Sequence, residues 1–330
     1  MRRIGVIIPV YNSGSHLLST VSSILSQEGD YDCKILIVND FSTDETTNEL
    51  LSRYVDNPVV TVINNDCNMG ICESRNKGLR LLVSSVDFVM FVDHDDVLAP
   101  LAFQKLMGAF DENPDTVAVM GIAYKFGPLV TSEENDIFVQ NQKIRKSVSF
   151  CGGRFDVSYK ATNLLTYPVI LASYTVHPPA KALIRSSALV RSGVIFEKRF
   201  ELIEDWIFWI KLSRFGDIYA IDEETAGYRW HQSNNSQSGN QLVQLKNGWK
   251  YLFWYSLQSK EYLFSYLKVL GGTRTGNCNY YKSLTEQTVY TQMKYSYNFL
   301  IVLLLRLVIQ IGNLNSGSRS HRISVAGSVN

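Results

Sequence analysis

Several signatures of nucleotide-using proteins are missing from this chain of 330 residues. No G-x-x-x-x-G-K-[ST] segment is present, so we do not expect a P-loop nucleoside triphosphatase. No G-x-G-x-x-G follows the first apolar run, which disfavours a dinucleotide-dependent dehydrogenase. The glycine-rich segment GGTRTG at 271–276 has neither that spacing nor that context, and we interpret it as a loop.

Paired cysteines, excess charge and a secretory signal are also lacking. The five cysteines include no C-x-x-C pair and no zinc-ligand spacing, which favours free thiols in a reducing compartment. The formal net charge is only +1, whereas a general nucleic-acid-binding protein would be distinctly basic. The apolar run in MRRIGVIIPVYN is too short for a secretory signal. We therefore expect a cytoplasmic protein that does not bind nucleic acid.

Strand-like and helix-like segments alternate over the first 124 residues. Five short apolar runs predict strands, at 4–10, 34–38, 59–63, 87–92 and 117–124. Between them, apolar residues recur at helical spacing over 15–27, 44–54, 71–83 and 100–110. This alternation predicts an α/β fold with a mostly parallel central sheet and flanking helices.

The pattern changes beyond residue 124. Residues 125–163 are polar and contain glycine and proline breakers, so we expect irregular structure there, a lid or acceptor-binding loops. A second structured part follows, then an aromatic-rich helical region and a Ser/Gly/Asn-rich end that we expect to be disordered. The predicted organisation is a catalytic domain at 1–240 (nucleotide-binding half 1–124, acceptor-binding half 125–240), a helical region at 241–312 and a disordered tail at 313–330.

Three polar clusters directly follow predicted strands. They are Tyr11-Asn12 after the first strand, Asn39-Asp40 after the second and Asp93–Asp96 after the fourth. Ligands of open α/β sheets bind beyond the carboxyl ends of the strands. These residues, although far apart in sequence, should therefore converge on one crevice.

The third cluster places three carboxylates within four positions, and carboxylates this close repel one another unless a cation lies among them. Mg²⁺ and Mn²⁺ prefer oxygen ligands and often take only one or two from the protein, the rest from water and substrate phosphates. Asp93 and Asp95 suit that role. The alternative is a solvated acidic turn that caps the following helix.

Five segments of the chain occur in a recognisable order: VIIPVYNSGSHLLSTVSSILSQ, ILIVNDFSTDET, NMGICESRNKGL, FVMFVDHDDVLAP and ELIEDWIFWIKL. Together they resemble the pattern of glycosyltransferase family 2, over about residues 4–235. The resemblance implies a GT-A fold that binds a nucleotide sugar, with Mn²⁺ or Mg²⁺ as the cofactor.

The resemblance implies nucleotide-binding roles in four of these segments. The Pro-x-Tyr-Asn of the first lies under the nucleotide, and the aspartate after the second strand hydrogen-bonds the base. The Arg-Asn of the third lies near the nucleotide, and the first aspartate of the D-x-D tends toward the ribose. The matching residues here are Pro9, Tyr11, Asn12, Asp40, Arg75, Asn76 and Asp93.

The metal and the general base are also implied by the resemblance. The second aspartate of the D-x-D, Asp95, would hold the metal that bridges the diphosphate, with His94 as a spacer and Asp96 as a supporting or capping residue. Asp205 would take the proton from the incoming hydroxyl, and Glu204 would orient the acceptor or another side chain. From the residues alone, this acidic pair is a helix start that the helix dipole favours.

The segment GYRWHQSNNSQS resembles the Tyr-Arg-x-His-x-x-Ser that follows the base in this family. On that basis His231 would approach the diphosphate or complete the metal coordination, and Arg229 would offset phosphate charge. The alternative for a lone histidine is a structural residue with satisfied hydrogen bonds. Asn39 and Phe41 depart from the family pattern, which often has Asp and Gly there, and leave the base contacts of Asp40 open.

The predicted reaction is a single displacement with inversion at the anomeric carbon, from a nucleotide-diphosphate sugar, commonly a UDP-sugar, to a saccharide or lipid-linked saccharide. The resemblance implies the assembly of a bacterial surface polysaccharide such as O-antigen or capsule. One alternative is a sugar-1-phosphate nucleotidyltransferase, although PVYNSGSHL lacks the basic residue such an enzyme carries after its first strand. Another is a non-catalytic binding module, against which the intact aspartates argue.

The apolar run at 299–311 has thirteen residues, fewer than the ~20 that a bilayer-spanning helix needs. Tyr and Trp, which are favoured at lipid headgroups, are frequent in 249–297. We predict that 249–311 associates peripherally with the inner face of the plasma membrane. A core helix and a homodimer interface are the alternatives.

Overall fold

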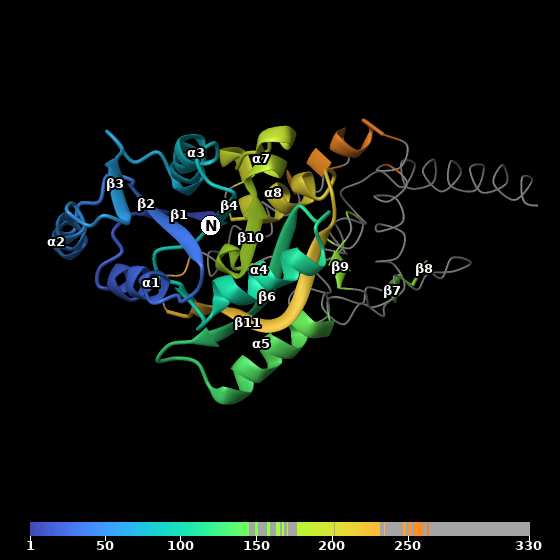
Figure 1. Cartoon of the computed structure of the whole chain (residues 1–330), viewed down its shortest axis with the longest axis horizontal. Coiled ribbons are helices and arrows are strands. Elements are labelled where there is room, and N and C mark those ends of the chain that lie inside the picture. The colour runs from blue at the N-terminus through green and yellow to red at the C-terminus, as the bar shows by residue number, and fades with distance from the viewer. Residues whose placement is uncertain are drawn as a thin grey trace, which may run out of the picture. The chain divides into compact units, whose positions relative to one another are not determined.

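The computed structural model describes residues 1–144, 149–150, 157–158, 163–165, 167, 170, 177–200, 202–231, 234, 247–248, 251–252, 254–259 and 263 (Figure 1). The chain divides into two compact units, residues 1–149 with 157–248, and residues 150–156 with 249–330. The central sheet and the site described below belong to the first unit. Most of the predicted helical region at 241–312, including 299–311, and the whole tail at 313–330 lie outside the described residues.

A nine-stranded sheet forms the centre of the first unit. Its strands are β1 (Arg2–Val10), β2 (Tyr31–Asn39), β3 (Val60–Asn64), β4 (Phe88–Phe91), β5 (Val97–Leu98), β6 (Ala118–Phe126), β9 (Leu164–Leu165), β10 (Ala182–Arg185) and β11 (Ile218–Arg229). The strand order is β3-β2-β1-β4-β10-β6-β11-β5, with β9 paired to β11. Only β5, β9 and β10 run against the common direction, so the predicted mostly parallel sheet is confirmed.

Helices flank this sheet, and those expected in the first 124 residues are present. The helices are α1 (His16–Leu25), α2 (Glu45–Arg53), α3 (Ile71–Leu82), α4 (Ala102–Glu112), α5 (Ser132–Ile144), α7 (Ser186–Ser192) and α8 (Glu204–Leu212). Short 3-10 helices at Pro179–Lys181 and Lys198–Phe200 and the strands β7 (Ser149–Phe150) and β8 (Val157–Ser158) complete the described elements. In Figure 1, α3, α7 and α8 lie on one side of the sheet, and α1 and α5 lie on the other.

The sequence of strand β1 is continuously apolar because both faces of the strand are buried. Alternate residues of a strand face opposite sides of the sheet. Ile4, Val6 and Ile8 join a buried cluster that contains residues of α1, α2 and α4. Ile7, on the opposite face, packs against Gly78 of α3. Because helices cover both faces, every residue from the third position of this strand onward is buried.

Helix α5 differs from the irregular structure expected over 125–163. Thr131 and Glu134 form a capping box: the backbone N–H of Thr131 donates to Glu134 Oε2 at 3.0 Å, and that of Glu134 donates to Thr131 Oγ1 at 3.2 Å. Gln142 then fixes the helix to β6 through both polar atoms of its amide and the backbone of Ala123. These polar contacts, together with Phe138, which packs against the core cluster, hold a helix whose sequence shows no regular apolar stripe.

Within the described part of the chain, none of the helices combines the length and the apolar character needed to cross a bilayer. The predicted membrane-associated segment, 249–311, lies largely outside that part. Its peripheral association therefore stays a prediction.

The contact between α3 and β1 generates a stability prediction. A Cβ atom on Gly78 would lie 2.5 Å from Ile7 Cγ2, a branched and fully buried side chain. We expect Gly78→Ala to lower the free energy of unfolding by ~1–3 kcal/mol through overpacking. Gly108→Ala is the matched control, because a Cβ there meets nothing within 4 Å. That change should stabilise α4 by up to ~1 kcal/mol. Urea titrations giving equal effects for both variants would contradict the proposed close packing.

Candidate active site

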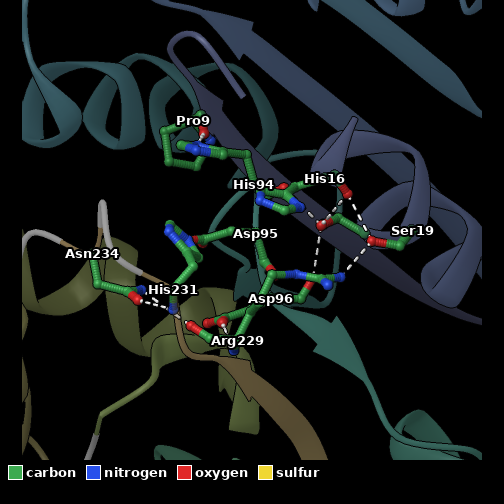
Figure 2. A network of polar contacts seen from close by, with 10 residues as sticks. Pro9, His16, Ser19, His94, Asp95, Asp96, Arg229, His231 and Asn234 are labelled. Carbon is green, nitrogen blue, oxygen red and sulfur yellow. Dashed lines mark hydrogen bonds and ion pairs between the residues drawn. The ribbon is translucent and has the colours of Figure 1, made fainter. Parts of the chain in front are cut away.

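The predicted polar clusters meet at one edge of the sheet. Strands β1, β2 and β4 are parallel neighbours, so the residues that follow their carboxyl ends lie side by side. Two distant segments reach the same edge. The end of β11 contacts the loop after β4 (Figure 2). The start of α8 contacts that loop through Arg75 of α3. The sequence-predicted convergence on one site is thus present.

Asp95 and His231 are in direct contact although 136 positions separate them. Asp95 Oδ2 lies 2.9 Å from His231 Nε2, and the two side chains are only 16% and 19% exposed. Burial opposes the ionisation of Asp95, but the hydrogen bond with His231 and the nearby imidazoles outweigh it and lower the pKa of Asp95. The ring of His16 stacks on that of His231, with centroids 5.2 Å apart (Figure 2).

Arg229 holds the loop that carries Asp95. Its Nε donates to the backbone oxygen of Asp95 at 2.8 Å, and its Nη2 donates to Ser19 Oγ of α1 at 2.7 Å. The guanidinium also lies over the ring of Phe126, 4.4 Å from the centroid. Arg229 therefore has a structural role besides the phosphate role implied by the family resemblance.

Asp96 lies fully buried behind the loop. Its Oδ1 accepts the backbone N–H of Arg229 at 3.1 Å, whereas its Oδ2 has no hydrogen-bond partner among the described residues. Burial, together with the charges of Asp95 and Asp93, raises the pKa of Asp96 well above its ordinary value. Asp96 thus supports the loop from inside, in agreement with a supporting role and not with direct ligand contact.

A buried arginine joins the two acidic segments of the site. Arg75 Nη2 donates to Asp93 Oδ1 at 2.6 Å, and Arg75 Nη1 donates to Glu204 Oε1 at 3.0 Å. The Arg75 guanidinium also lies 5.0 Å from the centroid of the Phe196 ring. Burial opposes its charge, but the carboxylates of Asp93 and Glu204 outweigh burial and raise the pKa of Arg75. The D-x-D loop and the Glu-Asp pair are therefore parts of one network.

Glu204 has a strongly altered protonation equilibrium. Its carboxyl group is buried at the first position of α8. Burial raises the pKa of Glu204 to about 7, with a further contribution from the negative charge of Asp205 and against the attraction of Arg75. A carboxyl group that changes its charge near neutral pH is suited to a site that handles protons.

Asp205 faces a histidine that carries no sequence signal of its own. Asp205 Oδ2 lies 3.3 Å from His177 Nδ1, and Asp205 Oδ1 accepts the backbone N–H of Trp206 at 2.7 Å. The ring of His177 meets that of Tyr228 edge to face, with centroids 4.7 Å apart. The side chain of His177 is 27% exposed and that of Asp205 is 6% exposed. The predicted base is therefore the inner member of a pair.

Asp40 is used to fix the start of α3. Its Oδ1 accepts from Asn65 Nδ2 at 2.7 Å and from the backbone N–H of Met69 at 2.8 Å, and its Oδ2 accepts from the N–H of Gly70 at 2.8 Å. A nucleobase would have to use the remaining lone pair of Oδ2. Base recognition by Asp40 stays a prediction, under that constraint.

Two further residues with predicted nucleotide contacts make structural hydrogen bonds. Asn12 Oδ1 accepts the backbone N–H of Thr43 at 2.8 Å, which ties the loop after β1 to the start of α2. Asn76 is buried and exchanges two hydrogen bonds, of 2.8 and 2.9 Å, with the backbone of Phe196. Neither contact was anticipated from the sequence, because both join segments distant in the chain.

Pro9 and Tyr11 lie at the end of β1. The carbonyl oxygen of Pro9 accepts from His94 Nδ1 at 3.4 Å, so the strand contacts the D-x-D loop. Tyr11 is 45% exposed, and the neighbouring Phe41 is 51% exposed with a left-handed backbone, φ 65°. An exposed aromatic side chain at each of two adjacent strand ends is compatible with base stacking.

The side chains of Asp95 and His231 fit a divalent cation. Mn²⁺ binds both carboxylate oxygen and imidazole nitrogen, and Mg²⁺ also prefers carboxylate oxygen. Within the described ranges, no three His, Cys, Asp or Glu side chains are arranged to hold a metal by themselves. The pair formed by Asp95 and His231 therefore suits an ion that takes its other ligands from a diphosphate and water.

Comparison with known proteins identifies the family. The family model described as "Glycosyl transferase family 2" matches residues 5–167, the part that contains the D-x-D loop, α3 and Asp40. This chain belongs to glycosyltransferase family 2. The resemblance noted from the five sequence segments is thus confirmed, as is the prediction that the protein is a transferase.

Two relatives and one solved structure show how this family 2 glycosyltransferase compares. An "Uncharacterized glycosyltransferase" of Haemophilus influenzae is 25% identical over 72% of this chain and 68% of its own length. The "Poly(ribitol-phosphate) beta-N-acetylglucosaminyltransferase TarP" of Staphylococcus aureus is 33% identical over 34% of each chain. The crystal structure of S. aureus TarS 1-349 in complex with UDP-GlcNAc gives a TM-score of 0.59 at 17% identity, over 87% of this chain and 77% of that one. The shared fold is GT-A.

The raised pKa of Glu204 generates a prediction for this glycosyltransferase. Between the ordinary value of 4.5 and about 7, the folded protein retains a proton on Glu204 that the unfolded chain releases. The free energy of unfolding should therefore fall as pH rises through this window. Glu204→Gln should lack this contribution, whereas Glu49→Gln on the exposed face of α2 should keep it. Urea titrations across this pH range measure both, and parallel pH profiles for wild type and Glu204→Gln would contradict the assignment.

Proposed function

We propose that this protein is an inverting glycosyltransferase that transfers a sugar from a nucleoside-diphosphate donor, in the first instance a UDP-sugar, to a saccharide or lipid-linked saccharide. The observation that carries this proposal is the Asp93–Arg75–Glu204 network, with contacts of 2.6 and 3.0 Å. It joins the loop expected to hold the donor to the helix start expected to handle the acceptor proton.

The donor side of the proposal uses Asp93, Asp95 and His231. Asp95 and His231 would hold Mn²⁺ or Mg²⁺, and Asp93 would approach the ribose. A divalent ion bound there supplies Lewis-acid stabilisation of the charge on the departing diphosphate. Support for a nucleotide-sugar donor comes from TarS, which shares the fold and whose structure contains UDP-GlcNAc.

The acceptor side depends on the carboxylate of Asp205. The acceptor hydroxyl oxygen attacks the anomeric carbon on the face opposite the diphosphate, so the configuration inverts as the bond to the diphosphate breaks. The hydroxyl proton must leave during this attack, and the buried Asp205 provides the negative charge that favours its removal. Glu204, held by Arg75, positions the start of α8 beside the D-x-D loop.

The proposed acceptor class follows from the relatives. TarP acts, by its name, on poly(ribitol-phosphate), and another relative is the "Minor teichoic acid biosynthesis protein GgaB" of Bacillus subtilis. We therefore place this enzyme in bacterial surface-polysaccharide assembly, with O-antigen and capsule as the candidates. Its peripheral membrane association through 249–311 stays a prediction, with a homodimer interface as the alternative.

Donor binding is testable without knowledge of the acceptor. We expect UDP with Mn²⁺ to raise the thermal unfolding midpoint more than UDP alone, because a ligand at ~100 times its dissociation constant stabilises the folded state by ~2.7 kcal/mol. Asp95→Asn should lose the Mn²⁺-dependent part of that rise. Differential scanning fluorimetry gives the measurement.

Asp111→Asn is the matched carboxylate control for this experiment. Asp111 pairs with Arg2 at the amino-terminal end of β1, the opposite edge of the sheet. It should therefore respond to UDP and Mn²⁺ as the wild type does. A full Mn²⁺-dependent rise in Asp95→Asn would refute the metal assignment.

Turnover should depend on Asp205. Replacing a group on which general-base assistance depends lowers rates by ~10²–10⁴-fold, and we expect Asp205→Asn to lower kcat by that factor at saturating donor. UDP release from a panel of UDP-sugars is the assay, and Asp111→Asn again serves as the control. Near-normal turnover by Asp205→Asn would remove it from the mechanism.

A further inference from the structure

His16 borders the predicted metal site, although no sequence signal pointed to it. It is the first residue of α1, where its backbone N–H donates to the carbonyl oxygen of Ser13 at 3.3 Å. Its ring stacks on that of His231, with centroids 5.2 Å apart and 29° between the ring planes. His231 Nε2 lies 2.9 Å from Asp95 Oδ2, so a single side chain stands between His16 and the predicted metal carboxylate.

The face of α1 that carries His16 is also bonded to the D-x-D loop. Thr20 lies four positions after His16, and side chains at this spacing share one face of a helix. The Thr20 hydroxyl lies 2.8 Å from the backbone oxygen of His94 and 2.7 Å from that of Asp96. Two independent sets of contacts therefore place His16 beside the loop that carries Asp95 (Figure 2).

The ring nitrogens of His16 are available to a ligand. In the part of the chain that the structure describes, neither nitrogen has a hydrogen-bond or ion-pair partner, and the residue is partly exposed. A neutral imidazole carries one N–H donor at its edge, whereas the stack on His231 uses the face of the ring. The edge of the His16 ring can therefore donate to a group that enters the site.

The surroundings of His16 favour an anion. Arg229 reaches from the end of β11 to α1, where its Nη2 donates to Ser19 Oγ at 2.7 Å. Three basic side chains, those of Arg229, His231 and His94, act electrostatically on His16 together with the carboxylate of Asp95. Several hydrogen-bond donors around one carboxylate suit a ligand that brings further negative charge, because phosphate oxygens accept strong, charge-assisted hydrogen bonds.

We infer that the His16 imidazole donates a hydrogen bond to an oxygen of the donor's diphosphate. This inference rests on the proposed function, in which Asp95 and His231 hold an ion that bridges that diphosphate. Diphosphate oxygens that the ion does not ligate still carry negative charge, and His16 offers them a donor from α1. The contact strengthens as further negative charge develops on the departing diphosphate.

Three substitutions in the full chain separate the role of the His16 ring from that of its nitrogen atoms. His16→Phe keeps an aromatic ring for the stack on His231 but has no donor, His16→Gln keeps an N–H donor but has no ring, and His16→Ala has neither. Isothermal titration calorimetry with UDP and Mn²⁺ gives the Kd. We expect His16→Phe and His16→Ala to raise it by ~10–100-fold, the effect of one hydrogen bond to a charged group, and His16→Gln to recover part of that loss.

Leu18→Ala is the matched control on the same helix. Leu18 is 48% exposed and lies two positions after His16, about 200° further round α1. Its truncation should leave the Kd for UDP unchanged, and the thermal unfolding midpoints without ligand show whether each variant is folded. At saturating UDP, the Mn²⁺ concentration that gives half of the thermal shift should be the same in His16→Phe and wild type, because His16 acts on the phosphate and not on the ion.

The outcomes distinguish this inference from the proposed function. Wild-type affinity in His16→Phe together with a loss in His16→Gln would overturn the inference, because the ring and not its nitrogen would then matter. A higher Mn²⁺ requirement in His16→Phe would also overturn it and assign His16 to the ion. Wild-type affinity in all three variants would overturn the inference and leave the proposed function intact. A wild-type protein that does not bind UDP with Mn²⁺ would overturn the proposed function together with the inference.

Discussion

The site depends on the buried positive charge of Arg75. Asp93 and Glu204 are both largely withdrawn from water, and both contact the Arg75 guanidinium directly. Arg75 satisfies both through a planar guanidinium, which can bond two carboxylates from separate nitrogens. Its fixed position rests on aromatic packing: Phe196 lies beside the guanidinium and stacks on Phe208 with centroids 4.3 Å apart. Removing one member of such a buried network typically costs ~3–5 kcal/mol, because a charge is left without its partner.

A second arginine, Arg229, holds the opposite side of the D-x-D loop in place. Arg229, the last residue of β11, hydrogen-bonds the backbone of Asp95 and the hydroxyl of Ser19. His231 follows Arg229 two positions later in the chain. The loop after β4 is therefore held by α3 on one side and by the end of β11 on the other. A catalytic carboxylate must be fixed to within a fraction of an ångström, and short loops do not provide this without such support. The polar network thus explains why residues from five distant segments are needed for one site.

The sequence predicted the first strands of the sheet well and the polar contacts between distant segments poorly. The apolar runs that became β1 to β4 and β6 were found because burial on both faces leaves a continuous β-branched signal. Helix α5 was missed because the Thr131–Glu134 capping box and the Gln142 contacts with β6 produce no apolar period. Asn12, Asp40 and Asn76 were expected at the nucleotide, yet each bonds backbone groups of another segment. His16 and His177 were not predicted, since lone histidines carry no periodicity or spacing.

The sequence by itself determined the family, the α/β class and the positions of the strand-end carboxylates, because hydrophobic periodicity and ordered motifs are local properties of the chain. Only the tertiary structure decided which acidic side chains meet which basic side chains. Arg75 and Glu204 are 129 positions apart, and Asp95 and His231 are 136 apart. Contacts at such separations depend on how the sheet brings its strand ends together, and no local pattern records that geometry. The same reason explains why the contact between His177 and Asp205 became visible only in the folded chain.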